Sequence, residues 1–508
     1  MSNQQQQKIA DFLTWFTKNG GTWSDSIRLQ HDEKFGYHVV ATTDIPHTNN
    51  DVEQPLIACP FGLTITQPLA KSFVLSARSS QTRPREEEIE VKGNVKADKG
   101  EASNLNERQW IASYLVLHLI GKDEVRLLPS TLQLPHLPYV NLLPAASEMT
   151  TPLLFTPQER ELISGSNLDH AVSDREKLWR AEWEAAKVVV CKGELGSLRE
   201  AFSWDRWLLA NTYITSRSFP SSLLQLDSRT FPSGSQPTDT DGNSDDGPYG
   251  MMLPGIDLLN HKRAEPVSWT SRPGREGKGE VGFSSRKGYK AGGQVWNNYG
   301  PKGNEELLMA YGFVIPDNPS DTSAVKLGIQ NNPSAEMQSL LDRAGLKVDE
   351  THQVRFDDPD SMSDRGRVKF LLPERLTRVV RICCGGKDEP RRNLEQILEG
   401  IASSPDPYEN KYVEAATVEM QAMEVLEGAF QSKAGAAQSR LWRIGGKKGQ
   451  PGIRDHVWQA CREYAKGQHD ILQSQYLRVS LELGDWEERL GPYMDEGAGE
   501  EYDDEWDE

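Results

Sequence analysis

The segment MLPGIDLLNH, residues 252–261, is the most informative stretch of this chain. It is an apolar, strand-like run that Asp257 interrupts and that Asn260 and His261 close. An amide and an imidazole at this position can cap the end of a strand, and they can also offer hydrogen bonds to a purine-bearing ligand. The segment by itself leaves both interpretations open.

Two further segments flank it in the sequence. TSRSF, residues 215–219, precedes it, and VWNNYGPKGNEELLMAYGF, residues 295–313, follows it. The second of these contains Tyr299 in a glycine turn, a predicted helix over residues 304–309, and then the sequence YGF. A single tyrosine in a turn is most often structural. The occurrence of all three segments in this order favours a functional site.

The combined pattern resembles the SET-domain protein methyltransferases. It is most similar to the branch that contains the Rubisco large-subunit lysine methyltransferase and the fungal ribosomal-protein lysine methyltransferases. The resemblance runs from residue 12 to residue 490, and D-x-x-N-H at 257–261, N-Y-G at 298–300 and Y-G-F at 311–313 are jointly specific. Supporting motifs are FGYHVVATTDI at 35–45, LPYVNLLP at 137–144, FSWDRWLLANTYITSRSF at 202–219 and EYAKGQHDIL at 463–472.

The resemblance implies an α+β fold with a β-rich SET core, a pseudoknot, a helical insert and an all-α C-terminal substrate-binding domain. In the pseudoknot, the chain near residues 253–261 and the chain near residues 299–313 would thread each other. The implied boundaries are an N-terminal helix at 1–21, a first core part at 22–106 with a polar insertion at 77–106, a helical insert at 107–247, a second core part at 248–318, a helical substrate-binding domain at 323–490 and an acidic disordered tail at 491–508.

The resemblance also implies a site for S-adenosyl-L-methionine beside a channel for a substrate lysine. Tyr299 would be the catalytic tyrosine, and Asp257 and Tyr311 would contact the substrate. Arg217 would pair with the cofactor carboxylate, which suits a planar and permanently charged guanidinium. The implied cofactor-binding residues are Phe35, Gly36, Tyr37, Ser216, Arg217, Phe219, Asn260, His261 and Phe313. Methyl transfer of this kind requires no metal.

The sequence departs from the family pattern at His38, where the family has the second glycine of a Gly-x-Gly turn. A side chain beside the cofactor could weaken binding, or the turn could tolerate it. The Cys-rich flanks of many histone-modifying members are also absent, because the five cysteines are scattered and none forms C-x-x-C. This favours a substrate other than a histone, and it indicates a reducing compartment, the cytoplasm or the nucleus.

Composition restricts the classes of partner. The 508 residues carry a net charge of −18, which argues against broad nucleic-acid binding. No apolar run approaches the roughly 18 to 20 residues that span a bilayer. Residues 495–508 hold nine acidic side chains and no basic one, so this tail is either a solubilising end or a tether for basic proteins. We therefore expect a monomer that acts on a lysine-bearing protein, with no membrane and no direct nucleic-acid partner.

Three functions remain open from the sequence. The first is a protein-lysine methyltransferase that acts on a ribosomal protein or a translation factor. The second is a protein-histidine methyltransferase of the related actin-modifying branch. The third is a SET-fold binding module that has lost catalysis, against which the retention of Arg217, Asn260, His261, Tyr299 and Tyr311 argues.

Hydrophobic periodicity predicts the local structure. Residues 8–19 read as an amphipathic helix that the following glycine pair ends. Residues 26–45 and residues 55–67 each read as a pair of short strands. Helices are predicted over 107–120, 175–202 and 202–219, and then over 333–344, 373–384, 392–403, 409–431 and 452–485.

Overall fold

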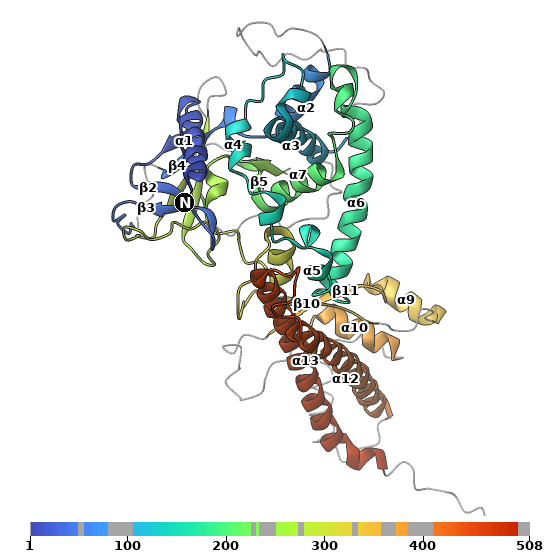
Figure 1. Ribbon diagram of the computed structural model, residues 1–508. Coiled ribbons are helices and arrows are strands. Elements are labelled where there is room, and N and C mark those ends of the chain that lie inside the picture. Colours follow the sequence, from blue (N-terminus) through green and yellow to red (C-terminus); the bar gives the residue numbers. More distant parts are fainter. Residues whose placement is uncertain are drawn as a thin grey trace, which may run out of the picture. The chain divides into compact units, whose positions relative to one another are not determined.

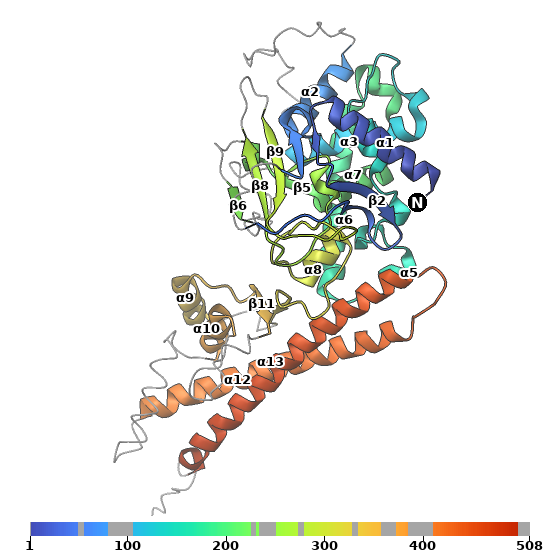
Figure 2. The ribbon, with the colours of Figure 1, turned by 90° about the vertical axis from the view of Figure 1, so that its left-hand side faces the viewer.

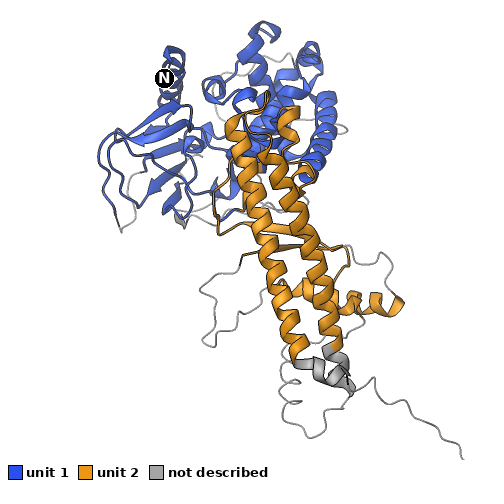
Figure 3. Ribbon diagram, turned by 60° about the horizontal axis from the view of Figure 1, so that its bottom comes forward, with its two compact units in different colours: residues 1–155, 170–302, 309–312 blue, residues 156–169, 303–308, 313–508 orange. Residues whose placement is uncertain are grey.

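The structure is a computed structural model that describes residues 2–48, 55–79, 105–224, 230–232, 250–272, 279–327, 334–356, 372–384 and 410–495. The chain forms two compact units that are interleaved in sequence (Figure 3). The first unit comprises residues 1–155, 170–302 and 309–312, and the second comprises 156–169, 303–308 and 313–508. The described residues combine helices with antiparallel strands, which confirms the α+β class. The finer domain boundaries stay a prediction.

The first unit contains a five-stranded antiparallel sheet, part of which is seen in Figure 2. Its strands follow the order β1 (Thr22–Trp23), β4 (Ile57–Pro60), β9 (Glu280–Ser285), β8 (Val267–Arg272) and β6 (Thr230–Pro232). Two smaller antiparallel pairs join β2 (Ile27–Asp32) to β3 (Gly36–Ala41) and β5 (Ser218–Pro220) to β7 (Gly250–Met252). The β2–β3 pair confirms the two strands predicted over residues 26–45.

The strand pair predicted over residues 55–67 is wrong. The structure has the single strand β4 in this range. Its partners are the distant strands β1 and β9, so no hairpin forms within the segment. The chain then makes a 3-10 turn over Phe61–Leu63, and helix α2 (Gln67–Arg78) begins. Thr66 caps this helix by accepting a hydrogen bond from the Leu69 amide, and Pro68 occupies its first turn, where a missing N–H costs nothing.

The helices of the first unit surround one continuous core. Helix α1 (Asn3–Lys18) begins at a capping box of Ser2 and Gln5 and buries Ile9, Phe12 and Phe16. Helix α3 (Glu107–Glu124) is buried on every side from Gln109 to Gly121. This burial explains its largely apolar sequence, because a helix without a solvent face needs no polar stripe. The remaining helices are α4 (Leu137–Leu142), α6 (Asn167–Val190) and α7 (Trp204–Arg217).

Two buried histidines in this core are fixed as neutral tautomers. His118 donates from Nδ1 to the Tyr114 carbonyl, and its Nε2 accepts from the His136 amide. His136 donates from Nε2 to the Leu63 carbonyl and accepts from the Tyr114 hydroxyl. Burial and the neighbouring His136 lower the pKa of His118 to about 3, and burial lowers the pKa of His136 to about 4.

These histidines should make the protein less stable in mild acid. In the unfolded chain both bind protons near pH 6.5, whereas the folded protein excludes those protons. The contribution of these two histidines to the free energy of unfolding should therefore be complete above pH 6.5. On acidification this free energy should fall by roughly 1 kcal/mol per pH unit for each histidine. Urea titrations at pH 6.5 and pH 5.5 measure this slope. A His136→Gln variant should show a smaller slope of unfolding free energy against pH, whereas a variant of the exposed His170, His170→Gln, should keep the slope of the parent protein. An unchanged slope in His136→Gln would refute the role given to His136.

The second unit is built on two long antiparallel helices, α12 (Asn410–Gly445) and α13 (Asp455–Asp495), which lie side by side in Figures 1 and 2. Helices α9 (Ala335–Ala344) and α10 (Glu374–Cys383) accompany them, and Arg381 of α10 forms a buried bidentate ion pair with Glu419 of α12. The prediction of a purely helical region is wrong in one respect, because β10 (Thr322–Lys326) pairs with β11 (Thr351–Arg355). The helix predicted over 392–403 lies outside the described residues.

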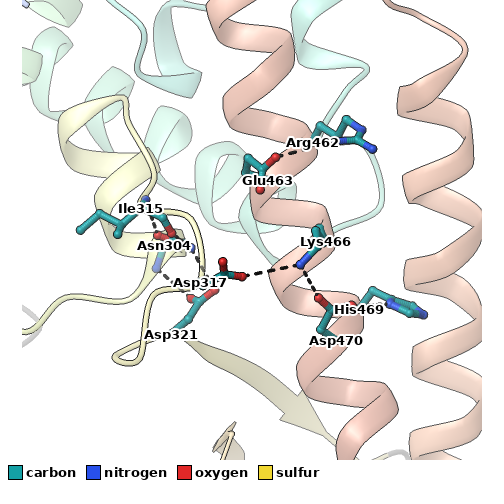
Figure 4. A network of polar contacts seen from close by, with 9 residues as sticks. All are labelled: Asn304, Ile315, Asp317, Asp321, Arg462, Glu463, Lys466, His469 and Asp470. Carbon is teal, nitrogen blue, oxygen red and sulfur yellow. Dashed lines mark hydrogen bonds and ion pairs between the residues drawn. The ribbon is translucent and has the colours of Figure 1, made fainter.

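Polar contacts connect α13 to short segments of the same unit. In Figure 4 the Lys466 ammonium lies between the carboxylates of Asp470, at 2.8 Å, and Asp317, at 3.8 Å. Beside it Asn304 donates to both oxygens of Asp321. The short helix α5 (Pro157–Arg160) contributes Glu159, whose side chain is fully buried and accepts from the backbone and the guanidinium of Arg454 at 2.8 to 3.0 Å.

Candidate active site

The site forms where two distant segments of the first unit run side by side. The Asn297 amide donates to the Asn260 carbonyl at 2.8 Å, and the Lys262 amide donates to the Asn297 carbonyl at 2.8 Å. Asn298 then accepts from the Gly300 amide through its side chain, and Gly300 has a φ of +94°. An asparagine and a glycine at these positions make the tight turn that presents Tyr299. The resemblance to the SET-domain family implied that these two segments meet.

Three aromatic rings are stacked at this junction. The ring centroids of His261 and Tyr299 are 5.0 Å apart at 25°, and those of Tyr299 and Tyr311 are 4.9 Å apart at 28°. His261 accepts the Tyr299 amide at Nδ1, over 2.9 Å. Burial, helped by the positive charge of Lys302, lowers the pKa of His261 to about 4, so the imidazole is neutral at physiological pH.

The Tyr299 hydroxyl is held by the backbone. It donates to the Leu259 carbonyl at 2.9 Å. Burial raises the pKa of Tyr299 to about 12, so this group is a hydrogen-bond donor and acceptor at neutral pH and does not act as an ionised base. A neutral hydroxyl and a row of carbonyl oxygens can orient an amine without a change of charge.

The glycine of the YGF motif has a steric role. Gly312 has a φ of +79°, and a Cβ atom there would lie 2.2 Å from Thr150 Oγ1 and 2.9 Å from the Thr151 nitrogen. The close approach brings the chain at Tyr311 against this neighbouring segment. Any larger residue would displace the outermost ring of the stack.

A buried polar group lies behind the rings. The Asp257 carboxylate, which has no exposed surface, accepts from the Tyr139 hydroxyl at 2.6 Å and from Arg217 Nη1 at 3.3 Å. Arg217 Nη1 also donates to the Asp257 backbone carbonyl at 2.9 Å. Among the described residues, Arg217 Nε and Asp257 Oδ1 are buried without a hydrogen-bond partner. Unsatisfied buried polar atoms of this kind are rare and indicate a place for a polar ligand.

The turn between β2 and β3 adjoins this group. Asn260 donates through its side chain to the Phe35 carbonyl at 3.2 Å, which ties the turn to the 257–261 segment. Gly36 has a φ of +61°, and no atom lies within 4 Å of the position that its Cβ would occupy. The backbone of the turn is thus open to close approach by a ligand.

The structure brings together most of the residues that the sequence singled out. Phe35, Gly36, Arg217, Asp257, Asn260, His261, Tyr299 and Tyr311 are linked by the contacts above, and Tyr37 packs edge-on against His31. Ser216 donates its hydroxyl to the Thr212 carbonyl within α7, and the Phe219 ring is buried against Trp269 at 5.4 Å. Phe313 belongs to the second unit. The individual roles of all these residues stay predictions.

Sequence reasoning missed Tyr139 as part of the site. It lies in the LPYVNLLP motif, where an apolar setting gives no sign that the hydroxyl meets a carboxylate 118 residues away. The second missed residue is Lys302, whose ammonium lies 5.8 Å from the centre of the Tyr311 ring. Its position three residues after Tyr299 was the available signal. Within the described residues no three histidine, cysteine or acidic side chains gather into a metal site.

Comparisons with known proteins add to this geometry. No family model matches the chain. A ribosomal lysine N-methyltransferase, set10, of Schizosaccharomyces pombe is 34% identical over 191 residues, which are 38% of this chain and 30% of that protein. Ribosomal lysine N-methyltransferase 1 of Saccharomyces cerevisiae is 29% identical over 40% of this chain and 38% of its own length. The chain thus matches about a third of the length of these relatives.

Three further similarities cover more of the chain. An actin-histidine N-methyltransferase of Danio rerio is 25% identical over 73% of this chain and 51% of its own length. The solved structure of Rubisco LSMT with sinefungin and monomethyllysine aligns with a TM-score of 0.60, at 16% identity, over 96% of this chain and 94% of that one. The SET domain of LSMT with lysine and AdoHcy aligns with a TM-score of 0.59, at 14% identity, over 95% and 93%.

Proposed function

We propose that this chain, which has the SET-domain fold of the Rubisco LSMT structures and is related to the ribosomal lysine N-methyltransferases, transfers methyl groups from S-adenosyl-L-methionine to lysine side chains of proteins. The observation that carries the proposal is the Tyr299 hydroxyl, held by the Leu259 carbonyl between the rings of His261 and Tyr311. This arrangement of motif residues suits an amine that must be oriented and desolvated.

The residues present fit the cofactor on two counts. Arg217 keeps one fifth of its side chain exposed beside polar atoms that lack partners, which suits the carboxylate and ammonium groups of an amino acid. The Gly36 turn offers open backbone, and Asn260 and His261 would supply further hydrogen bonds. When bound, S-adenosyl-L-methionine supplies an electrophilic methyl group on a sulfonium.

The protein's own residues would prepare the amine. The lysine must be neutral and free of water to attack, and the aromatic walls of Tyr299 and Tyr311 exclude water while tolerating a cationic or methylated amine. Tyr299 and the nearby backbone carbonyls would hold the nitrogen in line for attack. The neutral His261 adds no positive charge of its own to oppose the approach of a lysine.

Cofactor binding should raise the melting temperature. A ligand that binds only the folded state stabilises it by about 2.7 kcal/mol at 100 times its Kd. For a chain of this size we expect a shift of a few degrees with S-adenosyl-L-methionine or its demethylated product, measured by differential scanning fluorimetry. Adenosine plus methionine at the same concentrations serves as a control. No shift at millimolar ligand would contradict the proposed function.

The finer proposal is a ribosomal protein or translation factor as substrate. Its support is the activity for which the fungal relatives are named, together with the acidity of the chain, which suits a lysine-rich partner. The experiment is incubation of the protein with labelled cofactor and a cell extract, followed by mass spectrometry of the labelled bands. Label on a ribosomal protein or a translation factor is the expected result, and label confined to other proteins would contradict this substrate class.

The histidine-methyltransferase alternative deserves the same experiment, because the actin-histidine relatives match a larger share of the chain. The modified residue separates the two activities: methyl-lysine supports the proposal, and methyl-histidine on actin supports the alternative. Absence of any label, with cofactor binding retained, would support a binding module that has lost catalysis.

We also propose a monomer that works in the cytoplasm or the nucleus without a direct nucleic-acid partner. The scattered cysteines support the reducing compartment, and the acidic charge supports the absence of a nucleic-acid partner. Separately, none of the helices in the described ranges is long and apolar enough to cross a membrane.

A further inference from the structure

Three side chains form hydrogen bonds with the backbone of the turn between β2 and β3. Asp32 Oδ1 accepts from the amides of Lys34, at 2.9 Å, and Phe35, at 2.7 Å. The Phe35 carbonyl accepts from Asn260. The next carbonyl, that of Gly36, accepts from His38 Nδ1 at 2.9 Å. These side chains thus satisfy four backbone polar groups of the turn before any ligand arrives.

The His38 imidazole connects the Gly36 carbonyl to the Gln30 side chain through its two ring nitrogens. A carbonyl oxygen can only accept, so Nδ1 carries the proton, and Nε2 accepts from the Gln30 amide at 2.9 Å. Gln30 is its cross-strand partner in the β2–β3 ladder. The residue is 2% exposed, and the Phe35 ring packs edge-on against it at 5.5 Å. The side chain therefore occupies buried space and does not obstruct the open side of the turn.

We propose that His38 is a positioning residue that sets the orientation of the Gly36–Tyr37 peptide for the cofactor; this inference rests on the proposed function. A trans peptide is planar, so fixing the Gly36 carbonyl toward His38 aims the Tyr37 N–H in the opposite direction, away from the imidazole. Glycine at φ +61° places little restraint of its own on this peptide. The hydrogen bond from His38 adds to the restraint that the pairing of Gly36 with Asp32 gives at the end of the β2–β3 ladder.

The test uses two variants, each of which keeps one of the two hydrogen bonds of His38. In His38→Asn the side-chain amide nitrogen replaces Nδ1 and can still donate to the Gly36 carbonyl. In His38→Gln the longer side chain replaces Nε2 and reaches Gln30 but not that carbonyl. Both variants lose the buried ring, so their melting temperatures should fall by similar amounts. Isothermal titration with S-adenosyl-L-methionine then measures what differs between them.

We expect the Kd of His38→Gln to rise about tenfold, and that of His38→Asn to stay within about threefold of the parent protein. At saturating cofactor both should retain kcat, because His38 does not touch the reacting atoms. Equal affinities in the two variants would overturn the positioning role and leave His38 as a structural core residue. If the parent protein bound no S-adenosyl-L-methionine, the proposed function would fail, and this inference would fail with it.

Discussion

The Tyr299→Phe variant should lose methyl transfer by roughly 100- to 1,000-fold in kcat, while its Kd for S-adenosyl-L-methionine changes less than threefold. The substitution removes only the hydroxyl that donates to the Leu259 carbonyl. The ring remains stacked between His261 and Tyr311, so the shape of the site is kept. Single-turnover assays with labelled cofactor measure the loss.

A matched control is Tyr289→Phe, which removes another buried tyrosine hydroxyl of the same unit. That hydroxyl contacts Glu265 and Ser285, and neither belongs to the proposed site. The control should lose stability without losing turnover at a temperature where it is folded. If Tyr299→Phe retained turnover near that of the control, the catalytic assignment of Tyr299 would be wrong.

The Arg217→Met variant should weaken cofactor binding at least 100-fold and also destabilise the fold by roughly 3 to 5 kcal/mol. The loss of affinity follows from removing the guanidinium that would pair with the cofactor carboxylate. The loss of stability follows because the buried Asp257 carboxylate would lose its ion pair with the guanidinium. Calorimetric titration and urea unfolding measure the two effects separately.

A double variant separates these effects. Arg217→Met combined with Asp257→Asn removes the uncompensated charge, so much of the lost stability should return. Cofactor affinity should not return, since the guanidinium is still missing. If the double variant recovered both properties, Arg217 would be a structural partner of Asp257 and would have no place in cofactor recognition.

The geometry that the sequence indicates best is local. The turn at Tyr299 needs Asn298 and Gly300, and the close contact between Gly312 and Thr150 leaves no room for a Cβ atom. These motif residues therefore determine the local backbone geometry themselves. Amphipathic helices such as α1 were predicted for the same reason, because their buried face repeats along the chain.

The residues that sequence missed depend on distant partners. Strand β4 pairs with the distant strands β1 and β9, and the sequence of 55–67 does not show those partners. Thr66 and Pro68 were the local signals that helix α2 begins there. Tyr139 gains its meaning only when Asp257 lies beside it. The orientation of His38 could not be foreseen either, because strand alternation allows either face and burial under the turn selects one.

The ion pair between Glu159 and Arg454 has a consequence for how the chain is made. The two residues are 295 positions apart, so Glu159 leaves the ribosome long before its partner is synthesised. Until then its carboxylate must stay hydrated, because burying it alone would cost several kcal/mol. The second unit should therefore complete its folding only after Arg454 has emerged from the ribosome, whereas the five-stranded sheet is complete once β9 has emerged. C-terminal truncations that end before Arg454 should yield nascent chains whose first unit is ordered and whose second unit remains open to proteases.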